Sequence, residues 1–341
     1  MTVKRIGVDL AKNVFQVHGI DEREKAVIRR RLKRSEFVAF FAQLPKCLVG
    51  LEASGGAHHW ARELQALGHD VRLMAPRFVG PYRKNDKNDG NDAEAVCEAV
   101  GRPNMRFVPT KSLEQQAVLS LHRARDLLVG HRTALINQIR GLLSEYGIVV
   151  GPGAGRLRQV IPEILEDGDN RLPALARELF ADLDARLREL DDHVERYDRR
   201  IDALAREMEP AQRLMRIEGI GPLTATATVA SVGDARVFRN GRQFAAWLGL
   251  VPRQYSSGST VRHGRITKRG DAYLRRLLIH GARALMRHIK GRDDPRSRWV
   301  NAVWQRRGFN KTIVALAAKN ARILWAVLAH ETSYQPGANS V

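Results

Sequence analysis

Four carboxylates occupy positions in the chain from which they could meet at one point. Asp9 ends one apolar run and Glu52 ends a second, whereas Asp89 and Asp92 lie three residues apart just before the helix-forming stretch 93–99. Two acids at strand ends and two on one helix face would form an oxygen cluster of the kind that binds hard divalent cations. In a basic chain, this cluster predicts metal-assisted chemistry on a phosphodiester.

The register of the second acid pair is open. An Asx-rich repeat over residues 85–92 also places Asp86 and Asp89 three residues apart. We prefer Asp89 and Asp92 because Asp92 leads directly into the helix, which leaves Asp86 as a loop acid. Any one of these acids taken alone is more simply a cap or turn residue, so the prediction depends on the set.

A serine is the second candidate for chemistry. Ser257 precedes Gly258 in a hydroxyl-rich segment that lies inside a basic stretch. A serine hydroxyl is a poor nucleophile until it is activated, but nearby arginines could stabilise charge that develops on phosphorus, and a metal could assist deprotonation. Ser259 is an alternative nucleophile. From the residues alone, a turn rich in serine and glycine is the favoured explanation of this segment.

The basic stretch, residues 253–292, contains a single acid, Asp271. Because the charge is nearly all of one sign, the stretch predicts a track for phosphates rather than an ordinary solvated face. The side chains expected to contact nucleic acid are Arg253, Arg262, Arg265, Lys268, Arg269 and Arg276.

Composition supports a polyanionic partner. The chain has 341 residues and a formal net charge of +20, which favours nucleic acid first and an anionic membrane surface second. We find no apolar run long enough to span a bilayer and no signal peptide, and we expect a cytoplasmic, nucleoid-associated protein. Cys47 and Cys97 both lie in apolar segments and are expected to be buried thiols.

Three regions are expected to position these residues. Residues 1–110 alternate short strands and helices, which predicts an α/β domain with a mixed sheet. The expected strands are 4–10, 14–19, 26–31, 47–51 and 70–74, and the expected helices are 35–43 and 58–67.

Residues 111–210 are predicted to form long helices. One covers 111–146, and the other follows Pro173 with apolar residues in steps of three and four, the coiled-coil pattern. The two could form an antiparallel hairpin within one chain or an interface between chains, and the sequence does not choose.

Residues 211–333 are predicted to form a mostly helical domain. Residues 214–225 resemble a helix-hairpin-helix whose second helix could hold a phosphate through its amides. A glycine-rich turn packed in a core is the alternative. Two further helices are expected at 296–307 and 312–330.

These motifs together resemble those of the DEDD transposases of bacterial insertion sequences, whose relatives include the pilin gene invertase. The matching segments occur in the family's order through nearly the whole chain: 6–12, 51–55, 88–93, 217–221, 244–253 and 257–259. The resemblance implies a RuvC-like N-terminal domain with a ribonuclease-H fold, a coiled coil and a C-terminal transposase domain.

The resemblance also implies chemistry and partners. The family's four acids correspond to Asp9, Glu52, Asp89 and Asp92, which would bind Mg²⁺ or Mn²⁺, and its nucleophile corresponds to Ser257, which would form a covalent serine–DNA link. A bridge RNA encoded by the element would pair with target and donor DNA and guide the reaction. The protein would work as a dimer or tetramer in which the acids of one chain meet the serine of another.

Three other functions are compatible with parts of the sequence. A RuvC-like Holliday-junction nuclease would use the acids and metal without a serine intermediate, and the basic serine segment argues against it. An actin-like or sugar-kinase-like ATPase would need a second glycine-rich phosphate loop, which we do not find. A non-catalytic nucleic-acid-binding protein would keep the acids for structural reasons only.

Overall fold

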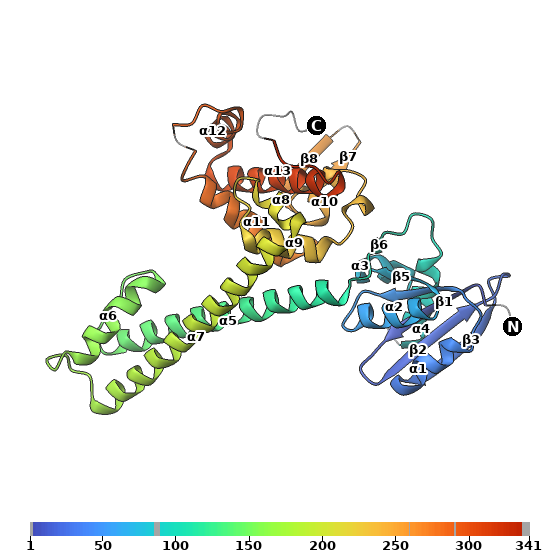
Figure 1. Ribbon diagram of the computed structural model, residues 1–341, viewed down its shortest axis with the longest axis horizontal. Coiled ribbons are helices and arrows are strands. Elements are labelled where there is room, and N and C mark those ends of the chain that lie inside the picture. The colour runs from blue at the N-terminus through green and yellow to red at the C-terminus, as the bar shows by residue number, and fades with distance from the viewer. Residues whose placement is uncertain (1–2, 85–88, 259, 290, 336–341) are drawn as a thin grey trace. The chain divides into compact units, whose positions relative to one another are not determined.

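The computed structural model describes residues 3–84, 89–258, 260–289 and 291–335, without the side chains of Asp89 and Ala154. The chain divides into two compact units, Met1–Ser112 and Leu113–Val341 (Figure 1). The second unit contains both the long helices and the C-terminal helical region, and the division of these two regions into separate domains stays a prediction.

The first unit contains a six-stranded mixed sheet with the strand order β3-β2-β1-β4-β5-β6. Its strands are β1 (Arg5–Leu10), β2 (Val14–Ile20), β3 (Ala26–Lys33), β4 (Leu48–Glu52), β5 (Asp70–Met74) and β6 (Phe107–Val108). The first three strands are antiparallel neighbours, whereas β1, β4 and β5 run parallel and are joined through helical crossovers. The predicted mixed α/β domain is confirmed and is consistent with a RuvC-like fold.

Helices cover both faces of this sheet (Figure 1). They are α1 (Phe37–Ala42), preceded by the 3-10 turn η1 (Arg34–Glu36), then α2 (Ala57–Ala66), α3 (Pro76–Val79), the 3-10 turn η2 (Gly80–Tyr82) and α4 (Asp89–Val100). On the face covered by α1 and α2, the Phe15 ring lies 4.8 Å from that of Phe37 and 5.2 Å from that of Trp60, edge to face. These buried aromatic rings form the centre of the first core.

Helix α4 covers the opposite face and packs there on two glycines. A Cβ at Gly7 would overlap the backbone of Ala93 and Cys97, and one at Gly50 would lie 2.7 Å from the Cβ of Val100. Arg5, at the start of β1, donates to the carbonyl of Cys97 at 3.1 Å. The helix therefore runs against the direction of β1, with its N-terminal turn toward the end of the strand that carries Asp9.

Two long helices dominate the start of the second unit. They are α5 (Leu113–Glu145) and α7 (Ala174–Glu207), with α6 (Ala154–Glu166) between them in the chain. Arg125 Nη2 donates to Asp198 at 3.1 Å and Arg132 donates to Asp191 at 3.1 Å, so the two helices lie side by side and antiparallel (Figure 1). Of the two arrangements left open, the structure shows the hairpin within one chain. Its coiled-coil geometry stays a prediction.

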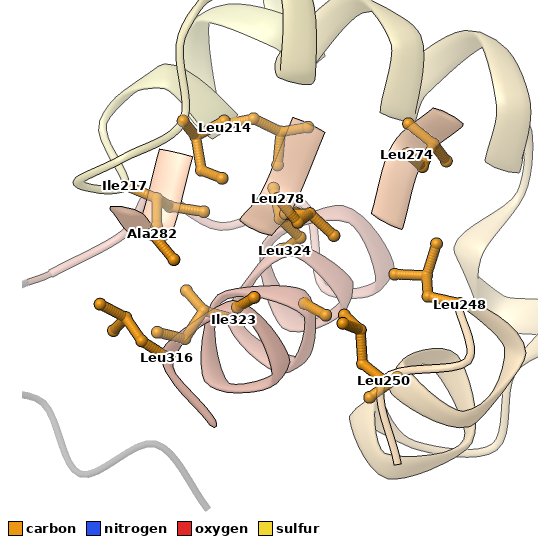
Figure 2. Close-up of a cluster of buried hydrophobic side chains, with 14 of the residues drawn as sticks. Leu214, Ile217, Leu248, Leu250, Leu274, Leu278, Ala282, Leu316, Ile323 and Leu324 are labelled. Carbon is orange, nitrogen blue, oxygen red and sulfur yellow. The ribbon is translucent and has the colours of Figure 1, made fainter. Parts of the chain in front are cut away.

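The rest of the second unit is mostly helical, as predicted. Its elements are α8 (Glu209–Met215), α9 (Pro222–Val232), the 3-10 turn η3 (Ala235–Val237), α10 (Gly241–Trp247), β7 (Pro252–Ser257), β8 (Thr260–Ile266), α11 (Ala272–Leu285), α12 (Pro295–Arg307) and α13 (Phe309–Ala329). Figure 2 shows part of this core: Leu278 of α11 is drawn next to Leu324 of α13, and Leu274 lies on the side of Leu248, with Leu214 and Leu250 in the same cluster.

Helix α13 corrects one expectation. By length and composition it could cross a membrane, with a mean hydropathy of 1.5, so the prediction that no run was long enough is wrong by that criterion. Half of the apolar segment of α13 is buried, and Leu316, Ala317 and Leu324 are fully buried. A helix with this buried face is the central helix of a folded core.

The helix-hairpin-helix-like segment is formed by α8, a glycine turn and α9. Gly219 has a φ of +82°. A Cβ there would lie 3.0 Å from the carbonyl oxygen of Gly281, and a Cβ at Gly281 would overlap the carbonyl of Gly219. Close packing of the turn on α11 thus accounts for both glycines, and phosphate binding by this segment stays a prediction.

Candidate functional site

Two of the predicted acids are neighbours at the ends of adjacent parallel strands. Val8 of β1 pairs with Leu51 of β4, which places the next residues, Asp9 and Glu52, side by side. Side chains alternate along a strand, and both carboxylates come two residues after a glycine that faces α4. Asp9 and Glu52 therefore lie on the face of the sheet that α4 covers, and both are half-buried.

The remaining acids belong to the first turn of α4. Asp92 is buried and accepts a hydrogen bond from the Arg83 guanidinium. It directly precedes Ala93, whose carbonyl lies over Gly7, so it occupies the end of α4 nearest the strand ends. Asp89 begins the helix but its side chain is not described, and Asp86 lies outside the described residues.

The donor chemistry of these acids suits a hard cation. Mg²⁺ is commonly held by one or two carboxylates together with water, a demand that Asp9 and Glu52 meet at one sheet edge. Among the described side chains, however, no group of three or more His, Cys, Asp or Glu residues is close enough to hold a metal. Asp92 therefore does not complete a cluster with the strand-end pair in this arrangement, in which Arg83 engages it.

A basic cavity of about 410 Å³ lies on the same face of the sheet. Gln16, His18, Arg29 and Arg31 line it from the strands, and Glu94 lines it from α4. Gln16 pairs with Asp9 across β1 and β2, so the cavity borders the acids. Burial lowers the pKa of His18, and a hydrogen bond from Lys84 lowers the pKa of Glu94. Near neutral pH the histidine is uncharged, and the two arginines supply the positive charge beside the acids.

Ser257 lies at the tip of a hairpin that the sequence did not predict. It pairs with Thr260, which leaves Gly258 and Ser259 as a two-residue connection between β7 and β8. Gly258 has a φ of +56°, as such tight connections require. Ser259, the alternative nucleophile, lies outside the described residues. The sequence signal that could have found this hairpin is the pair Gly258-Ser259 between two short runs, because a Gly-Ser pair is typical of a two-residue turn.

The hairpin places an arginine on the same face as the serine. Tyr255 lies opposite Arg262, and Ser257 is two residues beyond Tyr255, so Arg262 is a diagonal neighbour of Ser257. Ser256 points to the other face, where its hydroxyl accepts from Gln254 at 2.9 Å. Every residue of β7 is exposed, so Ser257 is open to a large substrate.

The base of the hairpin is held tightly. Gly249 and Gly270 have φ values of +72° and +83°, and a Cβ on either would overlap the backbone of the facing segment. Thr267 N donates to the carbonyl of Val251 at 2.9 Å, and Lys268 N donates to that of Gly249 at 3.1 Å. The serine thus projects on an exposed arm with a firmly anchored base.

The predicted phosphate contacts differ in their surroundings. Arg253, Arg262 and Arg265 lie exposed on the hairpin, with Lys268 and Arg269 exposed at its base. Arg276 instead forms an ion pair with Asp126 of α5 and lies 5.3 Å from the Tyr273 ring. Its charge is engaged within the unit, whereas the hairpin arginines face solvent.

Sequence reasoning missed a buried polar network that joins α5 to α9 and α11. His122 of α5 lies 2.9 Å from the Tyr273 hydroxyl through Nδ1 and 3.0 Å from the Thr226 hydroxyl through Nε2. Thr226 donates its own proton to the Pro222 carbonyl at 2.7 Å, so it accepts from Nε2–H. Burial lowers the pKa of His122 to about 4 and raises that of Tyr273 to about 12. The network connects α5 to α9 and α11 through uncharged groups.

Known proteins similar to this chain match it over both units. Residues 6–148 match the DEDD family of IS110, described as "Transposase", and residues 211–299 match "Transposase IS116/IS110/IS902 family". A Pseudomonas aeruginosa protein named "Probable family 20 transposase" is 55% identical over 99% of this chain and 100% of its own length. The chain belongs to the IS110/IS116/IS902 family of insertion-sequence transposases.

Two less similar members of the family also match nearly the whole length of this chain. The "Transposase for insertion sequence element IS1111A" of Coxiella burnetii is 46% identical over 98% of this chain and 92% of its own length. The "Transposase for insertion sequence element IS1328" of Yersinia enterocolitica is 38% identical over 97% of this chain and 98% of its own length. The predicted transposase is therefore confirmed as an enzyme that cuts and rejoins DNA, and the nuclease alternative is not favoured. The DEDD family typically uses divalent metals.

Proposed function

We propose that this transposase breaks and rejoins DNA through a covalent intermediate on Ser257. The observation that carries the proposal is the hairpin itself, which presents one face with the serine and Arg262 on an exposed arm with a fixed base. A substrate as bulky as a DNA duplex can reach a nucleophile placed in this way, which a buried serine would not allow.

The chemistry is a balanced exchange of phosphate esters. The Ser257 Oγ forms a bond to phosphorus while the bond from phosphorus to one deoxyribose oxygen breaks, and the serine proton passes in net terms to that leaving oxygen. Arg262 lies on the face where it can stabilise negative charge on the phosphoryl oxygens. A second strand's hydroxyl then reverses the step, so the number of ester bonds is conserved and no other energy source is needed.

We assign the metal to the acids of the first unit. Asp9 and Glu52 at the sheet edge, with Asp89 and Asp92 on α4, would hold Mg²⁺ or Mn²⁺, which would supply Lewis-acid stabilisation of the phosphate. Arg83 pairs with Asp92 in the structure, so Asp92 would join the metal only once this ion pair opened. Arg29 and Arg31 can bind the neighbouring phosphates of the strand that enters.

We also propose that a bridge RNA encoded by the element guides the reaction, and that a dimer or tetramer pairs the acids of one chain with the serine of another. Two features support these partners. The net charge of +20 suits the binding of two kinds of nucleic acid, and each unit carries a basic surface of its own, beside the acids and on the hairpin.

Trapping the intermediate tests the nucleophile. The protein is incubated with labelled element-end DNA, its RNA and Mg²⁺, and the covalent adduct is detected on a denaturing gel. Ser257→Ala should abolish the adduct, whereas Ser256→Ala, on the opposite face of the same strand, should retain it. An adduct that survives Ser257→Ala, or one that Ser259→Ala alone removes, would refute the assignment.

The acids are tested in the same assay. Asp9→Asn should remove both the adduct and strand cleavage while leaving DNA binding close to that of the wild type, because the change preserves shape and lowers negative charge. If Ser257→Ala still cleaves DNA in a metal-dependent manner while Asp9→Asn does not, the protein is instead a metal-only nuclease.

A further inference from the structure

A second cavity, of about 770 Å³, lies in the C-terminal helices and takes no part in the proposed chemistry. Residues of α10, α12 and α13 line it, and it contains neither the acids nor the hairpin. Its volume falls in the range of about 300–1,000 Å³ that is typical of small-molecule sites. The side chains that matter for its chemistry are Arg242, Trp299, Lys319, Arg322, Trp325 and His330.

The cavity is rich in cations and has no matching acid. None of its lining residues in the described chain carries a carboxylate. Within the same described part, Arg242, Lys319 and Arg322 form no ion pair. Burial lowers the pKa of Lys319, and the charges of Arg296 and Arg322 lower it further. Three cations that lack an ion pair among the described residues, Lys319 half-buried and Arg242 and Arg322 exposed, favour the binding of an anion here.

The walls of the cavity are aromatic and fixed. Trp325 donates its indole N–H to the carbonyls of Ala235 at 3.1 Å and Phe238 at 3.2 Å, which holds the ring in place. Lys319 Nζ lies 4.6 Å from the centre of the Trp299 ring, so an ammonium already rests on that aromatic face. Flat rings next to cations suit a ligand that has both a planar aromatic part and a negative charge.

We propose that this cavity binds one unpaired nucleotide of the nucleic acid on which the protein acts. The base lies against the two tryptophans, and its phosphate lies against the three cations. A base held outside its stack would fix the register of the strand on the second unit, at a site separate from the serine. DNA and RNA share this chemistry, and the experiment distinguishes them.

Charge is tested first, by the binding of labelled single strands of one mixed sequence, made as DNA and as RNA. The variant Lys319→Gln/Arg322→Gln should bind more weakly, and the slope of log affinity against log salt should fall by about 0.7 for each phosphate that the variant no longer neutralises. The matched control is Arg306→Gln/Lys311→Gln, which removes the same charge from exposed positions of α12 and α13. The kind of strand, DNA or RNA, whose binding changes more is the one that the cavity binds. Equal effects of the two variants would overturn the proposal.

Stacking is tested separately, with a strand of the same length that lacks bases. Trp299→Leu should weaken binding of the base-containing strand about tenfold and leave the abasic strand unaffected. Trp299→Phe, which keeps an aromatic face, should restore most of the affinity, and melting temperatures check that each variant folds. An equal loss on both strands, or no loss at all, would show that no base enters the cavity. The adduct on Ser257 is a separate readout, so the proposed catalysis can stand if the pocket fails.

Discussion

At Gly7, strand β1 and helix α4 come so close that a methyl group cannot fit between them. The same contact sets the height of α4 above the sheet, and with it the position of Asp92 relative to the strand ends. The backbone of Cys97 would have to move to admit a Cβ, since its Cα alone would lie 2.6 Å away. A residue without chemistry of its own thus controls the geometry of the acids.

We expect Gly7→Ala to lower the free energy of unfolding by about 1–3 kcal/mol, because overpacking forces the backbone to shift. It should also reduce DNA cleavage more than DNA binding, since the acids move while the basic surfaces remain. Urea denaturation and the adduct assay measure the two effects. Gly80→Ala is the control, because nothing lies within 4 Å of a Cβ there. Equal stability of the two variants would contradict the prediction.

His122 predicts a dependence of stability on pH. Its pKa is about 4 in the folded chain against an ordinary value of 6.5, so the unfolded chain takes up the proton first. The stabilisation is complete above about pH 6.5 and is lost as the pH falls toward 4, by at most about 1.4 kcal/mol per pH unit. Thermal unfolding across this range should show the loss, and His122→Gln should flatten it. An unchanged pH profile in the variant would assign the effect to other groups.

At the scale of elements, the arginines of the β7–β8 hairpin and the arginine Arg276 of α11 differ in what they contact. On the hairpin, Arg262 and Arg265 face solvent, whereas Arg276 on α11 is held by Asp126. Counting positive charges along the chain treats all three alike. The ion pair and the packing against Tyr273 instead make Arg276 part of the junction between α5 and α11.

Arg262→Gln/Arg265→Gln should therefore weaken duplex DNA binding and lower its salt slope by about 0.9 for each phosphate that is left without its arginine. Arg276→Gln should change the slope less and lower the melting temperature more, because it leaves Asp126 unpaired. Anisotropy titrations at several salt concentrations give the slopes. A larger fall in slope for Arg276→Gln than for the double variant would reverse this assignment.

The sequence predicted the helices and strands in which apolar residues recur at a regular spacing over enough positions. Five of the six strands in the sheet and both long helices follow from apolar periodicity, but β6 has only two residues and exists because it pairs with Leu73 and Met74 of β5. The β7–β8 hairpin was missed because all of β7 is exposed and carries no apolar face to alternate.

The candidate sites likewise contain some features that the sequence predicts and others that it does not. Asp9 and Glu52 end apolar strands, so their proximity was predictable from the order of elements. The engagement of Asp92 by Arg83 was not, because it joins a short turn to a helix through side chains alone. The tryptophan-lined cavity draws on three helices, and no local pattern marks residues that meet only after the helices pack.

At the scale of the whole molecule, two compact units imply two cooperative transitions. The first unit has two buried clusters that include residues of its sheet, and the second has one around α11 and α13 and another among α5, α6 and α7. Units with separate cores commonly unfold as separate steps. The chain should therefore show two calorimetric transitions.

Two glycine variants assign these transitions. Gly7→Ala should lower only the melting temperature of the first unit. Gly219→Ala should lower only that of the second, because its φ of +82° is unfavourable for alanine and its Cβ would lie 2.8 Å from Leu285. Scanning calorimetry of the full chain measures both. A single transition that both variants shift equally would show that the chain unfolds as one cooperative block.

Strand β3 forms one border of the sheet and carries Arg29, Arg30 and Arg31 in succession, all exposed. The outer rim of such a strand has unpaired amides and carbonyls, a template on which another copy could extend the sheet and begin to aggregate. Two copies that approached rim to rim would bring their arginine rows together, and like charges directly opposite one another are destabilising. The arginines that can bind phosphate near the acids thus also oppose edge-to-edge pairing of the sheet with other copies, and so oppose aggregation.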